Sequence, residues 1–263
     1  MTENRGRGST TSGALDGAVV KAPGGFGRAG GSAPRGANAG LLVLELGPAL
    51  VLLLLIIAVS FASPYFLTPR NIGDVLAQSA VIAILAMGQH LVILTRGIDL
   101  SVGSSLALSS VIGGLLYRHV DSSVLVILAM LLTGAAVGVV NGVIYVWGRL
   151  PHPFIVTLAT LSVARGLALE LQGGEAIPGM PTAVRFLGHA SVGWLPVSTI
   201  LVAVLALLVL FMARRLVWGR WIYAVGGNPE AAVRTGIPVK AVLVSVYVIA
   251  GLAAGIGAVV TSG

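Results

Sequence analysis

Five polar residues interrupt apolar stretches of the sequence and are candidates for contact with a polar solute. They are Asp99, Ser101, Asn141, Thr157 and Thr160. An ionisable group within an apolar stretch is by default a functional-site hypothesis. An aspartate just before Leu-Ser can equally cap or kink the start of a helix, which is the interpretation that we favour for Asp99. For the set as a whole, we predict a polar translocation path.

Residues that carry enzymatic chemistry do not occur in the patterns that enzymes use. The chain has no cysteine, which excludes disulfides and Cys-ligated zinc. It contains neither a G-x-S-x-G elbow nor an H-E-x-x-H pair. Lys21 and Lys240 stand outside any G-x-x-x-x-G-K-[ST] phosphate loop. We expect no catalytic residues, no metal site and no enzymatic activity from this chain.

Two charged residues, Arg165 and Glu170, share another apolar stretch. Five residues place them about 140° apart around a helix, so they do not form an ideal i, i+4 pair. Arg165 is therefore expected to pair with a neighbouring helix or to face water. Two interpretations are open, a buried structural pair and a clamp for a substrate, and we favour the buried structural pair.

The loop near 214–240 contains the signals of a short helix. Asn228 is a predicted N-cap and Pro229 fills the first helical position. Glu230 adds a negative charge where the helix dipole favours it. Gly236 is a predicted C-terminal glycine, and Pro238 prevents continuation. The helix is either an interfacial loop helix or a docking element for a soluble partner.

The composition indicates whether the chain folds in water or in a membrane. Charged residues make up 10% of the chain, hydrophobic residues 56%, and the mean hydropathy is +0.99. Soluble domains carry about 25% charged residues. So few charges cannot cover a core in water, and we therefore predict an integral membrane protein.

Apolar stretches of membrane-spanning length predict an all-α, polytopic transmembrane helix bundle with about seven segments. We place them near 41–63, 72–95, 98–117, 122–147, 152–171, 192–213 and 241–261. The third is expected to have a broken or re-entrant start. Three glycines, Gly134, Gly138 and Gly142, fall on one face of the fourth and predict a close helix contact.

Residues 1–40 differ from the rest, because they hold eleven glycines, five basic residues and two acids. They are predicted to be a disordered, Gly-rich, basic cytoplasmic tail that precedes a transmembrane permease domain at 41–263. With the tail inside, twelve Lys and Arg residues fall on the inner side and three on the outer side. This bias predicts a multi-pass protein whose N-terminus and 214–240 loop are cytoplasmic. It also explains the net charge of +7 without nucleic acid.

Three strings resemble one family of transporters. The pattern Glu230-Ala-Ala-x-x-x-Gly236 resembles the EAA coupling loop of ABC importer permeases. The strings Gly97-Ile-Asp-Leu-Ser-Val-Gly103 and Pro153-Phe-Ile-Val-Thr-Leu158 are similar to signatures of the branch that imports ribose, xylose and related sugars. The resemblance covers about 65–263 in collinear order.

The resemblance implies the membrane-spanning subunit of an ATP-driven importer of a monosaccharide in the cytoplasmic membrane. Its implied partners are ABC ATPase subunits, an extracytoplasmic sugar-binding protein and a second permease copy, either identical or a close paralogue. ATP and Mg²⁺ would bind the ATPase subunits, so no cofactor is expected in this chain. The implied ATPase-coupling residues are Gly227, Asn228, Glu230, Ala231, Ala232 and Gly236.

An alternative hypothesis is a stand-alone secondary transporter or channel for a small polar solute. Such a carrier requires intramembrane sites for a coupling ion. Asp99, Arg165 and Glu170 are the few ionisable candidates in the expected spans. Members of the resembled family continue for several more membrane segments, so we also expect this chain to be C-terminally truncated.

Overall fold

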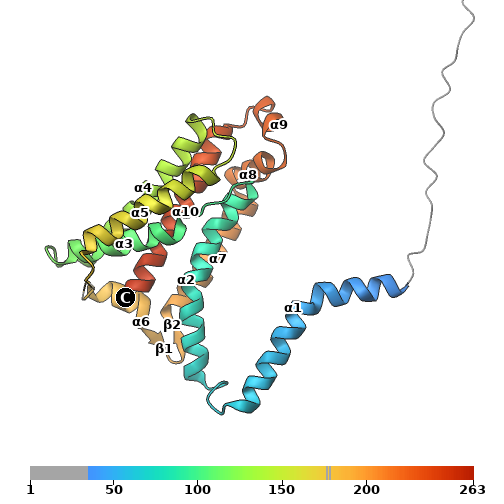
Figure 1. Ribbon diagram of the computed structural model, residues 1–263, viewed down its shortest axis with the longest axis vertical. Helices are drawn as coiled ribbons and strands as arrows, with labels where there is room; N and C mark the ends of the chain where they lie inside the picture. The colour runs from blue at the N-terminus through green and yellow to red at the C-terminus, as the bar shows by residue number, and fades with distance from the viewer. Residues whose placement is uncertain (1–34, 176, 178) are drawn as a thin grey trace, which may run out of the picture. The chain divides into compact units, whose positions relative to one another are not determined.

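A computed structural model describes residues 35–175, 177 and 179–263, with side chains from residue 46 onward. The described residues up to Ile57 and residues 58–263 belong to separate units, and each is described by itself. The elements, labelled in Figure 1, are α1 Arg35–Ala62, α2 Pro69–Leu94, α3 Val102–Tyr117, α4 Ser123–Trp147, α5 Phe154–Gln172, α6 Thr182–His189, β1 Ser191–Val192, β2 Leu195–Pro196, α7 Val197–Arg215, α8 Val217–Gly227, α9 Pro229–Arg234 and α10 Val239–Ser262.

Each of the seven expected segments corresponds to a helix, which confirms the all-α prediction. Helices α2, α4, α5, α7 and α10 are long and apolar enough to cross a membrane. Helix α1 covers the expected span at 41–63, and residues 35–40, which were expected to belong to the tail, already form its first turns. The rest of the predicted tail, residues 1–34, lies outside the described residues.

Helix boundaries follow local capping signals. Thr68 precedes Pro69 and accepts a hydrogen bond from the Asn71 amide, so α2 begins with a capped first turn. Ser122 caps α4 in the same way. Gly173, at φ +68°, ends α5 in the left-handed conformation that glycine adopts without strain.

Helix α10 is the centre of the bundle. In the most apolar part of each candidate span, 61% of α10 residues are buried, against 11–28% in the other four. The glycines of α4 confirm the predicted close contact. A Cβ on Gly138 would overlap the Tyr247 carbonyl oxygen, and one on Gly142 would come within 2.9 Å of the Val244 Cα. The two helices therefore meet backbone to backbone.

Helix α3 has the broken start that its sequence predicts. It has 16 residues, a length of about 24 Å, which is short of the roughly 30 Å of a hydrocarbon core. The preceding segment, 95–101, is not helical. Non-helical backbone at membrane depth must be enclosed by protein, and Thr95, Gly97, Asp99 and Ser101 in this segment are buried.

The expected span at 192–213 begins later than predicted. Residues 191–196 form an antiparallel hairpin in which Ser191 pairs with Pro196, and the turn contains Gly193 at φ +66°. The apolar residues Val192, Trp194 and Leu195 had extended the hydrophobic window into this hairpin. The short helix α6, just before it, was also not predicted.

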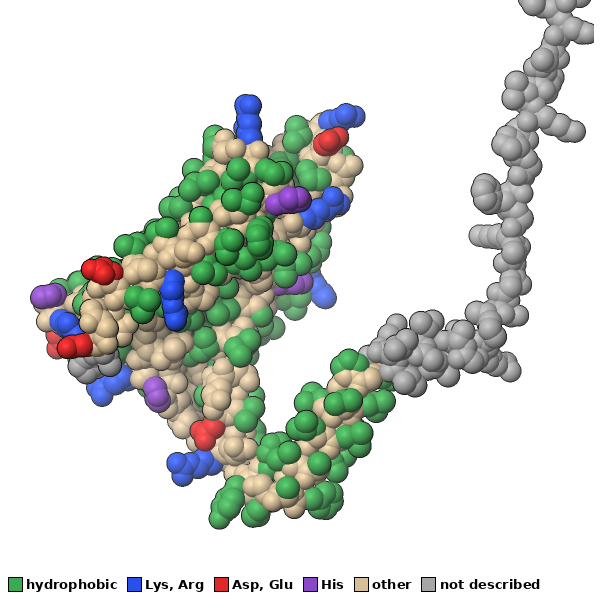
Figure 2. All heavy atoms as spheres, viewed as in Figure 1, with side chains coloured by type: hydrophobic (Ala, Val, Ile, Leu, Met, Phe, Trp, Pro, Cys, Tyr) green, Lys and Arg blue, Asp and Glu red, His purple; other side chains and the backbone are tan. Residues whose placement is uncertain are grey.

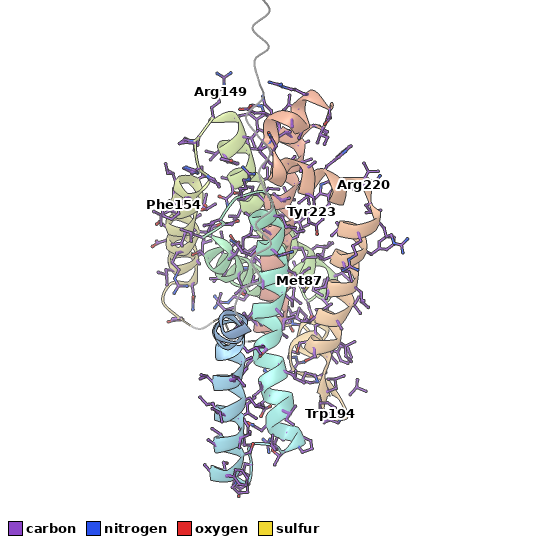
Figure 3. The ribbon with its side chains drawn as sticks, turned by 90° about the vertical axis from the view of Figure 1, so that its right-hand side faces the viewer. Met87, Arg149, Phe154, Trp194, Arg220 and Tyr223 are labelled. Atoms are coloured by element: carbon purple, nitrogen blue, oxygen red, sulfur yellow. The ribbon has the colours of Figure 1, made fainter. Side chains whose placement is uncertain are left out.

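The distribution of charge agrees with a membrane-embedded bundle. On the face that Figure 2 shows, most charged side chains of residues 58–263 lie toward the two ends of the helices, and hydrophobic side chains occupy the band between them. Figure 3 places Arg149 and Arg220 toward one end, Met87 between, and Trp194 at the other end. The Arg149 and Arg220 positions match the sequence-based expectation that both belong to one side of the membrane.

Candidate functional site

A buried polar cluster forms around the non-helical segment before α3. The Asp99 Oδ1 atom accepts hydrogen bonds from the Ser101 amide (2.8 Å) and the Ser101 hydroxyl (2.7 Å). The aspartate thus organises the two residues that follow it, in the manner of a turn-forming side chain. This agrees with the structural role favoured for Asp99, although Ser101 is the N-cap residue of α3.

The cluster extends across two further helices. Asn141 of α4 donates from Nδ2 to the Ser101 hydroxyl (2.8 Å) and lies 3.4–3.5 Å from the two Asp99 carboxylate oxygens. The Thr160 hydroxyl of α5 donates to Asn141 Oδ1 (2.6 Å). Thr157, one turn earlier, donates to the Ile98 carbonyl oxygen (3.3 Å). The structure therefore brings together all five residues that the sequence singled out.

Gln89 of α2 is a sixth member of the cluster, and it was not among the predicted residues. With its Nε2 facing the Asp99 carbonyl oxygen (3.2 Å) and its Oε1 facing the Asp99 amide (3.1 Å), the side chain satisfies both backbone groups of Asp99. Unpaired backbone groups are costly in lipid. The cluster therefore supplies hydrogen bonds to a stretch of backbone that has left the helix.

The same burial bears on the predicted translocation path. The exposed fractions of Asp99, Ser101, Asn141 and Thr157 are 4%, 1%, 1% and 0%. In this conformation a solute cannot reach them. Thr160 lines a separate, mostly apolar cavity between α3, α4 and α5. A direct role in translocation stays a prediction for these five residues.

A second candidate region is the helix pair α8–α9. Helix α8 was not predicted, because its sequence lacks a capping signal at its start. Helix α9 begins as expected, since Asn228 Oδ1 accepts a hydrogen bond from the Ala231 amide (3.0 Å). Gly236 follows α9 at φ +81°, a conformation that favours glycine. The predicted caps of this short helix are confirmed.

The two alanines of α9, both implied as ATPase-coupling residues, differ in exposure, which corrects the assignment of Ala232 to a docking surface. Ala232 is 3% exposed and packs with Ile222 and Val242 in a core of the chain itself. Ala231, Glu230 and the 61%-exposed Val233 are accessible instead. Any partner of α9 therefore contacts Ala231 rather than Ala232.

Arg96 connects the two regions. Its guanidinium donates from Nε to the Gly226 carbonyl oxygen (2.5 Å) and from Nη2 to the Gly227 carbonyl oxygen, at the end of α8. A cation at a helix C-terminus is favourable, because it neutralises unpaired carbonyls. Arg96 has a φ of +64°, uncommon for a residue other than glycine. It lies three residues before Asp99, so α8 is joined directly to the segment that carries the polar cluster.

Helix α8 is also fixed to its other neighbours. Trp218 donates from Nε1 to the Ser245 hydroxyl of α10 (2.7 Å). A Cβ on Gly226 would overlap the Leu94 carbonyl oxygen of α2, and one on Gly219 would overlap the Ala213 carbonyl oxygen of α7. A displacement of α8 must therefore move the ends of α2, α7 and α10 or break these contacts.

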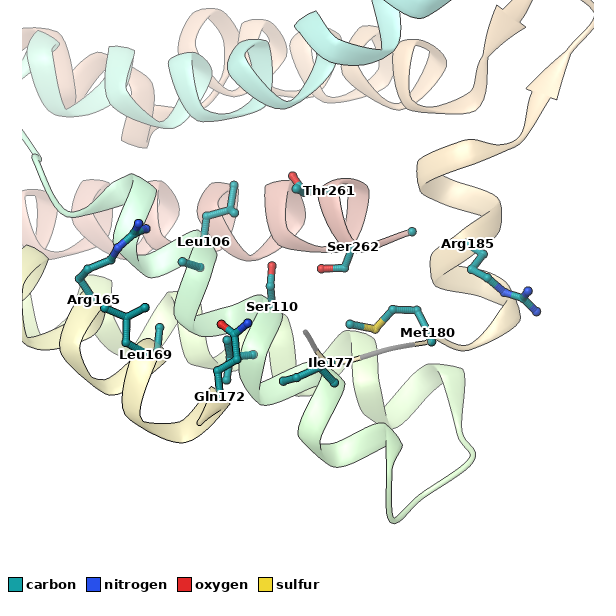
Figure 4. A pocket seen from close by; sticks show the side chains of 15 residues that line it. Leu106, Ser110, Arg165, Leu169, Gln172, Ile177, Met180, Arg185, Thr261 and Ser262 are labelled. Carbon is teal, nitrogen blue, oxygen red and sulfur yellow. The ribbon is translucent and has the colours of Figure 1, made fainter. Parts of the chain in front are cut away.

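Arg165 and Glu170 do not form the expected buried pair. Both are exposed, and neither has a hydrogen bond or ion pair with a residue that the structure describes. Arg165 instead lines a cavity of about 620 Å³, which we call the α5 cavity. Figure 4 shows side chains from α3, α5 and the end of α10 around it. Among the described residues, no cluster of His, Cys, Asp and Glu could hold a metal ion.

The sequence matches a model of the family described as the branched-chain amino acid transport system / permease component over residues 71–262. The chain belongs to this permease family. The match covers α2 to α10, and with them the polar cluster, the α8–α9 pair and the α5 cavity. The chain has several long apolar helices and is accordingly a multi-pass membrane protein.

Three curated relatives are named for sugars. The chain is 40% identical over 222 residues to the ribose import permease protein of Bacillus subtilis (strain 168), covering 83% of this chain and 68% of the relative. It is 37% identical over 214 residues to the D-allose transport system permease protein of Escherichia coli (strain K12), covering 80% and 65%. It is 36% identical over 231 residues to the L-arabinose ABC transporter permease protein of Azospirillum brasilense, and the match covers 86% of this chain and 67% of the relative.

These relatives confirm the resemblance that the three sequence strings indicated. The chain spans about two thirds of the length of the curated relatives that it matches. No solved structure matches it.

Proposed function

We propose that this chain is the membrane-spanning permease subunit of an ATP-driven ABC importer that carries a monosaccharide across the cytoplasmic membrane. The family description mentions branched-chain amino acids, whereas the relatives cited above are named for ribose, D-allose and L-arabinose. The identity to these relatives, 36–40%, supports a sugar over an amino acid.

The observation that carries the proposal is the α8–α9 pair. Helix α9 presents Glu230, Ala231 and Val233 outward, while Ala232 anchors it to the core. A short exposed helix that is fixed to the ends of three membrane helices can bind a soluble partner and transmit the partner's movement to those helices. That partner is an ABC ATPase subunit, which binds the ATP and Mg²⁺ that this chain is not expected to hold.

The remaining parts of the assembly follow from this role. The N-terminus and α8–α9 lie on the cytoplasmic side, where twelve of the Lys and Arg residues gather. An extracytoplasmic binding protein delivers the sugar to the opposite end, and a second permease copy completes the path. Closure of the ATPase subunits moves α9, and Arg96 passes the movement to the 95–101 segment. Coupling of this kind requires contacts that differ between two states.

A matched pair of surface substitutions tests the docking assignment in the full-length permease. Ala231→Arg places a bulky charge on the exposed face of α9, and Ser191→Arg places the same charge on the hairpin at the other end. We expect Ala231→Arg to lower ATPase co-purification and ATP-dependent uptake at normal membrane levels. Ser191→Arg should retain the ATPase. Full ATPase retention by Ala231→Arg would show that α9 does not dock it.

The same experiment separates the importer from a stand-alone secondary transporter. A carrier without an ATPase has no reason to lose uptake when α9 changes. If the purified, reconstituted permease transports sugar without an ATPase, driven by an ion gradient, the ABC importer assignment is wrong.

A further inference from the structure

We propose that Tyr247 is a positioning residue for the 95–101 segment, and that its hydroxyl changes hydrogen-bond partner during transport. In the present conformation the hydroxyl has no partner, and after Gly97 moves away it donates to the Val92 carbonyl oxygen. The inference rests on the proposed function, because it names the group in the bundle that responds when Arg96 passes on the movement of α9.

The Tyr247 hydroxyl is a buried donor that the fold leaves unused. Tyr247 belongs to α10 and is 1% exposed. Its hydroxyl oxygen is buried and has no hydrogen-bond partner among the described residues. Buried tyrosine hydroxyls usually have a partner, and a buried hydroxyl without one costs free energy. A conformation in which this hydroxyl is hydrogen-bonded would recover that free energy.

The neighbours of Tyr247 come from two helices and from the non-helical segment. A Cβ on Gly97 would lie 2.6 Å from the Tyr247 hydroxyl oxygen, so a larger residue would collide with it. The Tyr145 ring of α4 packs edge-on against the Tyr247 ring, with centroids 6.0 Å apart. Leu91 and Val92 of α2 belong to the same buried cluster as Tyr247. Of these neighbours, Gly97 is the one that belongs to no helix.

The Val92 carbonyl oxygen borders the same space and is already occupied. The Cβ on Gly97 would lie 3.3 Å from this oxygen. The oxygen accepts hydrogen bonds from the Gly97 amide (2.9 Å), the Thr95 amide (3.1 Å) and the Thr95 hydroxyl (2.9 Å). A carbonyl oxygen has two lone pairs, so a fourth donor finds none free. Gly97 therefore lies against the Tyr247 hydroxyl and also occupies the acceptor that this hydroxyl lacks.

A shift of the segment would release both constraints. Arg96, which precedes Gly97, has a strained φ of +64° and is bonded to the end of α8. A movement of α8 that pulls Arg96 displaces Gly97, breaks its bond to Val92 and leaves the carbonyl free for Tyr247. Helix α10 need not move, because its backbone is packed directly against α4. The new hydrogen bond offsets the lost one, so the two arrangements are close in free energy, and a partner's movement can shift the balance between them.

A matched pair of conservative substitutions tests this exchange of partners in the full-length permease with its ATPase subunits. Tyr247→Phe removes the hydroxyl and keeps the ring that contacts Tyr145. Ser198→Ala is the control. The Ser198 hydroxyl is also buried without a partner among the described residues, but it lies in the first turn of α7, next to the hairpin. Two quantities are measured for each variant, namely amide hydrogen exchange of the 95–101 segment without nucleotide and uptake per ATP hydrolysed.

Tyr247→Phe should hold the segment in the present conformation. Without the hydroxyl, the displaced arrangement loses its new hydrogen bond, whereas the present arrangement loses none. We therefore expect the Thr95 and Gly97 amides to exchange severalfold more slowly, and uptake per ATP hydrolysed to fall roughly tenfold. Ser198→Ala should change neither quantity.

Two results would overturn the proposal. Unchanged or faster exchange in Tyr247→Phe would show that the hydroxyl does not stabilise a displaced arrangement. Slower exchange with unchanged uptake per ATP hydrolysed would show that the displaced arrangement does not belong to transport. A parental complex without ATP-dependent sugar uptake would instead contradict the proposed function. The exchange measurement requires no transport, so it tests the role of the hydroxyl separately.

Discussion

The polar cluster around Asp99 and the α5 cavity around Arg165 both contain polar side chains, but these side chains differ in whether they have hydrogen-bond partners. In the cluster, carboxylate, amide and hydroxyl groups are buried and bonded to one another. In the cavity, the exposed guanidinium of Arg165 has no hydrogen-bond or ion-pair partner among the described residues. A satisfied buried network stabilises one structure, whereas an exposed, unpaired guanidinium can contact water or another molecule. The difference separates residues that hold the fold from residues that can bind.

The largest expected effect comes from breaking the cluster. Asn141→Leu keeps the side-chain volume but removes the partner of Ser101 and Thr160 and leaves the Asp99 carboxylate with fewer donors. Leaving such groups buried and unpaired costs about 3 kcal/mol in total. We expect loss of folded protein, measured as monodisperse yield and thermal midpoint in detergent. Arg165→Leu is the control, and it should be neutral or stabilising. Equal losses in both variants would remove the distinction between the two regions.

A smaller effect is expected at the link between the cluster and α8. Arg96→Gly relieves the positive φ, which costs an L-residue about 1 kcal/mol, but it removes both hydrogen bonds to the end of α8. Stability should change little, while uptake per ATP hydrolysed should fall roughly tenfold, a coupling loss of the usual size. Reconstituted uptake and ATPase rates measured on one preparation give this ratio. An unchanged ratio would show that α9 movement reaches the bundle by another route.

The smallest effect is expected when the negative charge of Asp99 is removed. Asp99→Asn retains an Oδ1 acceptor for the Ser101 amide and hydroxyl, so stability should fall by at most about 1 kcal/mol. ATP-dependent uptake should remain within about twofold, since a hydrogen-bonding role requires an acceptor rather than a negative charge. A stand-alone carrier that uses Asp99 for a coupling ion would lose transport. Uptake assays across a range of pH values decide between the two.

The positions of the membrane helices could be predicted from the sequence because hydropathy and glycine spacing report directly on contact with lipid and on close helix packing. The same signals do not show which face of a helix meets which neighbour. Arg165 was therefore expected to have a buried partner, and both Ala231 and Ala232 were assigned to the ATPase-coupling site. Ala232 is buried because it packs against residues of α8 and α10, whereas Ala231 is exposed.

The candidate site was predicted in part. The five residues of the polar cluster stood out because each is polar within an apolar stretch. Gln89 and Arg96 did not, since their partners are backbone atoms far away in the sequence or on a neighbouring helix. The positive φ of Arg96 has no signature in its residue type. Contacts of this kind depend on tertiary structure that a local pattern does not contain.

The glycine seam between α4 and α10 restricts how the bundle can change shape. At Gly134, Gly138 and Gly142 the two backbones approach without intervening side chains, so no rotamers can rearrange to absorb sliding or rotation. Interfaces built of larger side chains retain that freedom. Helices α4 and α10 must therefore act as one rigid body in any transition that keeps them intact.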